Sequence, residues 1–289
     1  LLAGYAGLIS VGQQGFIGLG AYMVLILADF GVNPFLGIPI AIAACAALAV
    51  PITFLVFRLR AEYFAIGTWV VAEVFHLVIV RFEQLGGGTG AGLPGLDALD
   101  PTTRGALTYW ATLAVLTASL AAVYLLLGSR QGLDLTAIRD DEVGARSAGV
   151  RVASAKRLVF VVSAAGCAGA GAMLIISQLN VEPDSIFSVQ WSAYMIFTVL
   201  IGGMGSIEGP IVGTIVFFVL QQSLAEQGAW YLIVLGLIAV LMAMFVPRGL
   251  WGLASGRGAR LFPVGYRLAG TEGAGGRWRP FRLGRGGPR

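Results

Sequence analysis

Long apolar segments follow one another along almost the whole of this 289-residue chain. A helix needs about 20 residues to cross a bilayer, and most of these segments have that length. Hydrophobic residues make up 57% of the chain and charged residues 12%, against roughly 25% charged in soluble domains. We therefore predict an all-α polytopic membrane helix bundle of about eight spans, at residues 1–28, 33–57, 63–82, 106–127, 157–178, 191–202, 207–224 and 229–246.

The basic residues lie almost entirely on one side of this topology. Of the nineteen Lys and Arg residues, only Arg81 and Arg104 fall in loops on the opposite side. Lys and Arg are enriched on the cytoplasmic side of membrane proteins, which orients the chain with its C-terminus inside. Because these residues lie at the inner ends of the spans, we expect anionic lipid headgroups as their partner, and no nucleic acid.

The chain is predicted to contain one transmembrane domain and one tail. The transmembrane domain covers residues 1–253, and residues 254–289 form a basic, Gly-rich cytoplasmic tail that we expect to be disordered. Cys45 and Cys167 lie within apolar spans and are interpreted as small core residues. The chain begins Leu-Leu without Met, so we expect the true N-terminus to be missing.

Two segments interrupted by glycines indicate where a pathway could run. The first lies at residues 4–20 and the second at residues 202–213. Closely spaced glycines let neighbouring helices approach, but they also favour a broken or re-entrant helix around a cavity, and both interpretations stay open. The weak similarity of the two segments is typical of an internal repeat around a pathway. The candidate pathway residues are Gly12, Gln13, Gly15, Gly202, Gly203 and Gly205.

The predicted span 63–82 carries two ionisable residues. Glu73 and His76 are three positions apart, so they share one face of a helix. Ionisable residues inside a membrane are costly and often functional, which adds both to the candidate pathway. A polar pair that is satisfied by its own hydrogen bonds is the alternative. His76 is the only His in the chain, so a His-based metal cluster is excluded.

The longest inner polar segment, residues 128–157, is predicted to contain a short helix. Asp140 is a suitable N-cap for a helix at about 141–148, with Asp141 and Glu142 in its first turn. Gly149 suits the left-handed position that follows such a helix, and Ala137, Ile138 and Arg139 are expected in a preceding turn. Loops of this length are uncommon without a function, so a docking element for a cytoplasmic partner is favoured over a solvated connection.

Several enzyme classes are excluded by their missing motifs. The sequence Gly-Gly-Gly-Thr-Gly at 86–90 lacks the Lys of a nucleotide-binding loop, and the only Lys of the chain is Lys156. A G-x-S-x-G elbow, an H-E-x-x-H motif and paired intramembrane carboxylates are also absent. We therefore predict no enzymatic activity, no cofactor bound by this chain and no ATP site of its own.

Five stretches in this order resemble the permease subunits of branched-chain amino acid ABC importers, the LivM-type family. The resemblance extends from Leu1 to about Leu253. The stretches that carry it are residues 4–13 with Phe16 and 18–22; residues 59–68 with Ala72 and Glu73; residues 137–142 with Gly149; residues 183–185 followed by 201–210; and residues 247–250.

The resemblance implies packed membrane helices around a central path in a bacterial inner membrane. It also implies two cytoplasmic ABC ATPase subunits that bind ATP, a second homologous permease subunit and an extracytoplasmic substrate-binding protein. The family's coupling helix corresponds here to Ala137, Ile138, Arg139, Asp140, Asp141, Glu142 and Gly149. Members of the family also carry urea and short amides, so the resemblance leaves the substrate open.

Two functions are compatible with these observations. The leading hypothesis is an ABC importer permease that receives energy through the inner segment 128–157. The alternative is a stand-alone secondary transporter in which Glu73 is a proton-linked site. Transport that needs neither ATP nor a binding protein would favour the alternative.

Overall fold

The computed structural model describes residues 1–59, 61–96, 100–224, 230–246 and 249–255, and it confirms the all-α prediction. The basic tail expected from residue 254 onward lies almost wholly outside the described residues, as do Arg60 and Arg248. The helices are α1 (Leu2–Tyr5), α2 (Gln13–Asp29), α3 (Pro34–Val56), α4 (Ala61–Arg81), α5 (Pro101–Gly128), α6 (Arg130–Asp140), α7 (Glu142–Ser147), α8 (Val152–Gln178), α9 (Pro183–Ile186), α10 (Val189–Gly202), α11 (Glu208–Leu224), α12 (Trp230–Phe245) and α13 (Gly249–Ser255).

Five helical segments in the described part of the chain are long and apolar enough to cross a membrane. They are Pro34–Val56, Tyr63–Arg81, Pro101–Gly128, Val152–Gln178 and Pro183–Gly202. The other predicted spans correspond to α2, α11 and α12, which have 17, 17 and 16 residues. The chain is thus a multi-pass membrane protein, while the count of eight spans stays a prediction.

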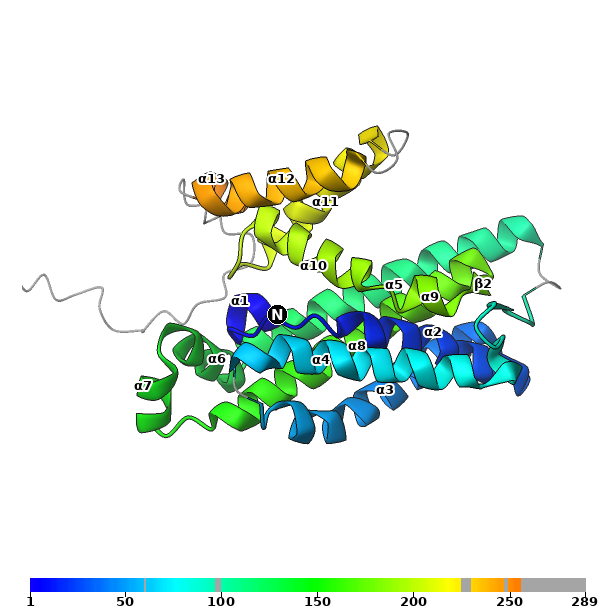
Figure 1. Ribbon diagram of the computed structural model, residues 1–289, viewed down its shortest axis with the longest axis horizontal. Helices are drawn as coiled ribbons and strands as arrows, with labels where there is room; N and C mark the ends of the chain where they lie inside the picture. Colours follow the sequence, from blue (N-terminus) through cyan, green and yellow to red (C-terminus); the bar gives the residue numbers. More distant parts are fainter. Residues whose placement is uncertain (60, 97–99, 225–229, 247–248, 256–289) are drawn as a thin grey trace, which may run out of the picture.

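Helices α2 and α8 form the centre of the larger part of the molecule, and α3, α4 and α5 surround them (Figure 1). Glycines, which have no side chain, allow the backbones of α2 and α8 to approach closely. A Cβ on Gly171 would lie 1.8 Å from the Ile17 carbonyl oxygen, and one on Gly20 would lie 2.1 Å from that of Ala168. Small residues at such crossings are how membrane helices gain close packing without a hydrophobic driving force.

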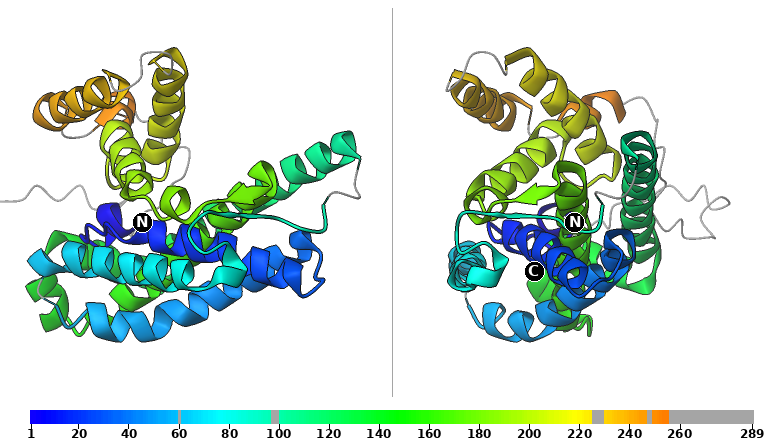
Figure 2. Two further views of the ribbon diagram at one scale, coloured as in Figure 1. Left: turned by 45° about the vertical axis from the view of Figure 1, so that its right-hand side comes forward. Right: turned by 90° about the vertical axis from the view of Figure 1, so that its right-hand side faces the viewer.

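Helices α11, α12 and α13 stand apart from this bundle, and α10 lies between them and it (Figures 1 and 2). They share a small core of their own with α10, formed by Phe197, Ile201 and Phe217. The larger bundle has two separate buried clusters, one toward each end of α2 and α8. The molecule therefore has two helical parts that meet at α10.

The two ends of the bundle carry different structures. Helices α6 and α7 lie at the end that is predicted to be cytoplasmic (Figure 1). At the opposite end, β1 (Ala91–Gly92) pairs antiparallel with β2 (Asn180–Val181), next to the 3₁₀ helix η1 (Glu83–Leu85) and α9. Side-chain caps fix where α3 and α5 begin at that end, because Asn33 and Asp100 accept hydrogen bonds from the amides of Phe35 and Thr102.

Candidate functional site

The first predicted span is broken. Helix α1 ends at Tyr5, α2 begins at Gln13, and the residues between them are not helical. Local bonds hold this break: the Thr68 hydroxyl accepts from the amide of Val11 at 3.2 Å, and the Ser10 hydroxyl accepts from the side chain of Gln13 at 3.3 Å. The glycines at residues 4–20 were compatible with close helix packing or with a broken helix. The segment before Gln13 is a broken helix.

A cavity of about 470 Å³ lies beside this break. Its walls come from α1 and the segment after it, from α8, from α10 and from the turn after α10. Most of the lining is apolar, and it includes a few hydroxyl groups and the side-chain amide of Gln13. The lining includes Leu8, Ile9, Ser10, Gln13, Ser163, Cys167, Ser192, Met195, Ile196, Thr198, Val199, Leu200, Met204 and Pro210.

Buried polar contacts tie the cavity walls to one another. Gln13 is buried and accepts a hydrogen bond from the Cys167 thiol of α8 at 3.5 Å. Its neighbour Gln14 accepts a hydrogen bond from the Ser192 hydroxyl of α10. Amides and hydroxyls at membrane depth, surrounded by apolar side chains, are typical of sites that bind a small solute with a polar head and an apolar body.

The glycines predicted beside Gln13 serve close packing. A Cβ on Gly12 would lie 2.0 Å from the Thr68 carbonyl oxygen, and one on Gly15 would lie 2.8 Å from the Ala72 side chain. Both positions therefore bring α2 against α4. Of the candidate pathway residues, Gln13 alone is among those that line the cavity.

Glu73 and His76 lie in the outer half of α4, away from the cavity lining. Their predicted pairing on one helix face is confirmed by a distance of 3.4 Å between Glu73 Oε1 and His76 Nδ1. His76 Nε2 lies 3.0 Å from Asp184 Oδ1 of α9, but not in hydrogen-bond geometry, so this is a charge pair only when His76 is protonated. The imidazole also packs on the Phe187 ring, with 5.6 Å between the ring centroids.

Gly202 is the last residue of α10, and Gly203 and Gly205 lie in the turn between α10 and α11. A Cβ on Gly202 would lie 1.8 Å from the Gly209 carbonyl oxygen, so the two helices cross in near backbone contact. Gly203 and Gly205 have φ of 115° and 88°, values that favour glycine. These glycines shape the turn, and their neighbour Met204 contributes the side chain that reaches the cavity.

The inner segment is more helical than its sequence indicated. Ala137, Ile138 and Arg139 belong to α6 and not to a turn, and Asp140 is the last residue of that helix. The predicted cap is therefore wrong by one residue: Asp141 caps α7, and its carboxylate accepts from the Val143 amide at 2.9 Å. Gly149 takes the left-handed conformation as predicted, with φ of 87°.

One ion pair connects α7 with the start of α8, and a second lies within α7. Glu142 accepts from Arg146 within α7 and from Lys156 of α8, both at 2.7 Å. The hydrogen bond from Lys156 holds the pKa of the Glu142 carboxyl below its usual value, against a smaller opposing effect of burial. Leu135, Ile138 and Ala145 are buried, whereas the Val143 side chain is 74% exposed. The segment is thus a braced unit with an exposed apolar tip.

The five long apolar helices define a multi-pass membrane protein, and a cavity of about 470 Å³ lies beside its broken first span. A family model described as "Branched-chain amino acid transport system / permease component" matches residues 1–244. The chain therefore belongs to this family, as its sequence motifs predicted. Its members are transport proteins and form a non-enzymatic class.

Two characterised relatives are similar over most of the chain. Both are named "High-affinity branched-chain amino acid transport system permease protein LivM", one from Escherichia coli K12 and one from Salmonella typhimurium LT2. They are 29% and 28% identical over 277 aligned positions, and the matches cover 86% of this chain. The chain spans 65% of the length of each relative. No solved structure matches it significantly.

Proposed function

We propose that this chain is the transmembrane permease subunit of an ABC importer that moves branched-chain amino acids, or related small polar solutes, into the cell. The observation that carries the proposal is the cavity beside the broken helix, in a chain of this family. A branched-chain amino acid has a polar head and a compact apolar side chain. The cavity offers matching groups, with Ser10 and Gln13 beside Leu8, Ile196 and Val199.

The energy for transport would come from outside this chain. Separate cytoplasmic ABC ATPase subunits, two in the whole transporter, would bind the ATP and push on α6 and α7. The buried side chains and ion pairs of this segment support the role, because only a braced element transmits a displacement instead of absorbing it. Exposed Val143 would lie at the contact, beside the predicted coupling residues Ala137, Ile138, Arg139, Asp140, Asp141, Glu142 and Gly149.

The remaining parts of the transporter follow from the same proposal. A second, homologous permease subunit would complete the path, and an extracytoplasmic binding protein would deliver the solute. The charge asymmetry of the sequence supports an orientation in which α6, α7 and the C-terminus would lie on the cytoplasmic side of a bacterial inner membrane. ATP would be bound by the partner subunits, and anionic lipid would contact the inner basic residues.

Replacing one amide in the cavity tests the proposed path. Gln13→Met keeps the length of the side chain but removes the amide, so KM for uptake into proteoliposomes should rise about five- to tenfold. Gln178→Met is the matched control, because this exposed glutamine at the outer end of α8 lies outside that cavity. Both variants should assemble with the ATPase. Unchanged uptake by the Gln13 variant would show that the solute takes another route.

A further inference from the structure

Three segments meet at the inner end of the bundle, around Arg139. The Arg139 side chain lies over the turn between α10 and α11, because a Cβ on Gly205 would be 2.9 Å from its Nη1 atom. Helix α1 reaches the same turn, because a Cβ on Gly4 would be 2.9 Å from the backbone nitrogen of Gly205. Helix α6, helix α1 and the turn are therefore in direct contact.

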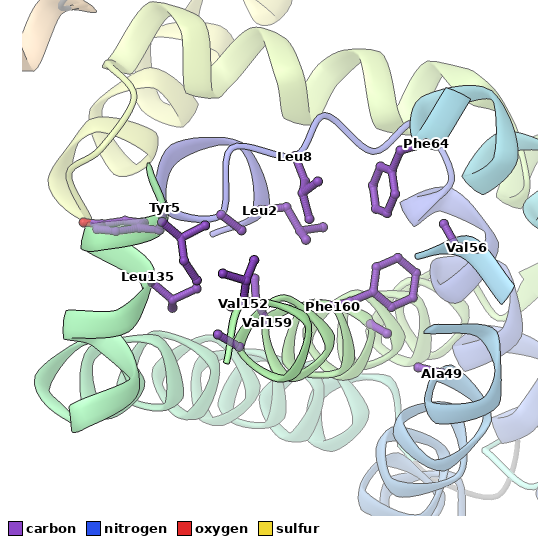
Figure 3. Close-up of a cluster of buried hydrophobic side chains, with 14 of the residues drawn as sticks. Leu2, Tyr5, Leu8, Ala49, Val56, Phe64, Leu135, Val152, Val159 and Phe160 are labelled. Atoms are coloured by element: carbon purple, nitrogen blue, oxygen red, sulfur yellow. The ribbon is translucent and has the colours of Figure 1, made fainter. Parts of the chain in front are cut away.

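The surroundings of Arg139 show that it faces the protein as well as the solvent. Its side chain is 38% exposed, and its nearest acid is Asp140 on the same helix, at 3.4 Å. The nearly buried Tyr5 hydroxyl of α1 lies within electrostatic reach of both Arg139 and the buried Glu208. Figure 3 shows Tyr5 of α1 and Leu135 of α6 side by side in the same buried cluster.

Two of these segments continue directly into the walls of the cavity. Leu2 and Ala3 of α1 line it, and so does the chain from Leu8 to Ser10 that follows. The turn contributes Met204, one residue before Gly205. A displacement of α6 that is carried through Arg139 would therefore reach both walls.

We propose that Arg139 is a positioning residue that joins the segment α6–α7 to Gly205 and α1, so that movement of this segment opens and closes the cavity. The inference rests on the proposed function and adds to it the route by which the force reaches the path. It also assigns Arg139 an internal role, whereas the sequence alone suggested a contact with the ATPase. Glycine at 205 suits the φ of 88° and leaves room for the guanidinium, which a Cβ would force to move.

Cysteine labelling tests the route without relying on uptake. In a background of Cys45→Ala and Cys167→Ala, Thr198→Cys provides a thiol in the cavity wall. In the assembled transporter, its labelling rate should differ between the nucleotide-free and the vanadate-trapped state. Arg139→Gln should reduce that difference about tenfold, within the usual range of coupling between sites, while the ATPase still co-purifies and hydrolyses ATP.

A pair of glycine variants separates the contact from backbone strain. Gly205→Ala and Gly31→Ala are matched, since φ is 88° at Gly205 and 81° at Gly31. A Cβ at Gly31 would meet nothing within 4 Å, whereas one at Gly205 would meet Arg139. Gly205→Ala should lose the nucleotide-dependent labelling, and Gly31→Ala should keep it.

The outcomes distinguish this inference from the proposed function. A labelling difference that persists in Arg139→Gln and Gly205→Ala would overturn the route through Arg139 and leave the permease role intact. Loss of ATPase binding in Arg139→Gln would also overturn it, because the residue would then act at the partner interface. If the unsubstituted transporter shows neither uptake nor nucleotide-dependent labelling, the proposed function itself fails.

Discussion

The Ser192 hydroxyl on α10 donates a hydrogen bond to the side chain of Gln14 on α2, across 178 positions of sequence. Both residues are almost completely buried. The bond joins the two helical parts of the molecule at the place where they meet, next to the proposed substrate cavity. The Ser192 hydroxyl and the Gln14 amide are polar groups at membrane depth, so each needs the other as its hydrogen-bond partner.

Removing this bond should weaken the contact between the two parts. Gln14→Met leaves the Ser192 hydroxyl without its partner, and we expect the protein in detergent to lose about 1 kcal/mol of stability. Thermal unfolding of the purified variant measures the effect. Ser192→Ala together with Gln14→Met should recover part of the loss, since no polar group is then left unpaired. A Gln14 variant as stable as the parent protein would show that the bond contributes nothing.

Two glycines on one helix should respond in opposite ways to alanine. A Cβ on Gly171 would lie 1.8 Å from the Ile17 backbone, so Gly171→Ala must push α8 away from α2 and should destabilise by about 1–3 kcal/mol. Gly166, also on α8, has no such neighbour, so Gly166→Ala should be neutral or should stabilise by up to about 1 kcal/mol. Unfolding midpoints in detergent compare the two, and equal midpoints would contradict the packing.

The attachment of α7 to α8 should depend on pH. The pKa of Glu142 is lowered mainly by its hydrogen bond from Lys156, so the stabilisation is present above the unfolded-state pKa. It is lost as the pH falls through the lower, folded-state pKa, when the carboxylate takes up a proton. Hydrogen exchange of the α7 amides should therefore accelerate as the pH falls below the ordinary pKa of a glutamate carboxyl, after correction for intrinsic rates. In Lys156→Met the acceleration of exchange at low pH should be smaller than in the parent protein. An identical pH profile in the two proteins would exclude the Glu142–Lys156 pair as its cause.

Glu73→Gln should retain most of the ATP-driven uptake. The Glu73 side chain is 51% exposed in the outer half of α4, where an amide can still accept from His76. A secondary transporter that uses this carboxylate for protons would lose all uptake in the same variant while still inserting normally. Uptake into proteoliposomes, measured once with ATP and the ATPase and once with a proton gradient alone, separates the two mechanisms.

The inner segment shows how far local sequence signals reach. The left-handed Gly149 was predictable, because its position after a short helix requires that conformation. The choice between Asp140 and Asp141 as cap was not, since both side chains can accept the same kind of bond. The end of α6 makes the choice, and α6 extends that far because Leu135 and Ile138 are buried in the same cluster as Tyr5 of α1.

The surroundings of His76 also combine a contact that the sequence predicts with contacts that only the tertiary structure reveals. The contact between Glu73 and His76 could be predicted from their spacing, because residues three apart on a helix face one another. Asp184 and Phe187 complete the surroundings of His76, and their approach depends on how α9 folds back over α4. Helical spacing cannot predict these contacts, because Asp184 and Phe187 are more than 100 positions from His76 in the sequence.

The sequence by itself determined the class of this protein and the positions of its long helices, because apolar length and the distribution of Lys and Arg are properties of local segments. It also determined the family, because the motifs and their order along the chain suffice for that. Only the tertiary structure decided which residues line the cavity and which glycines merely allow close packing. Ser10, Ser163 and Ser192 come together there from three separate segments. Their meeting depends on the packing of whole helices, which no single stretch of sequence encodes.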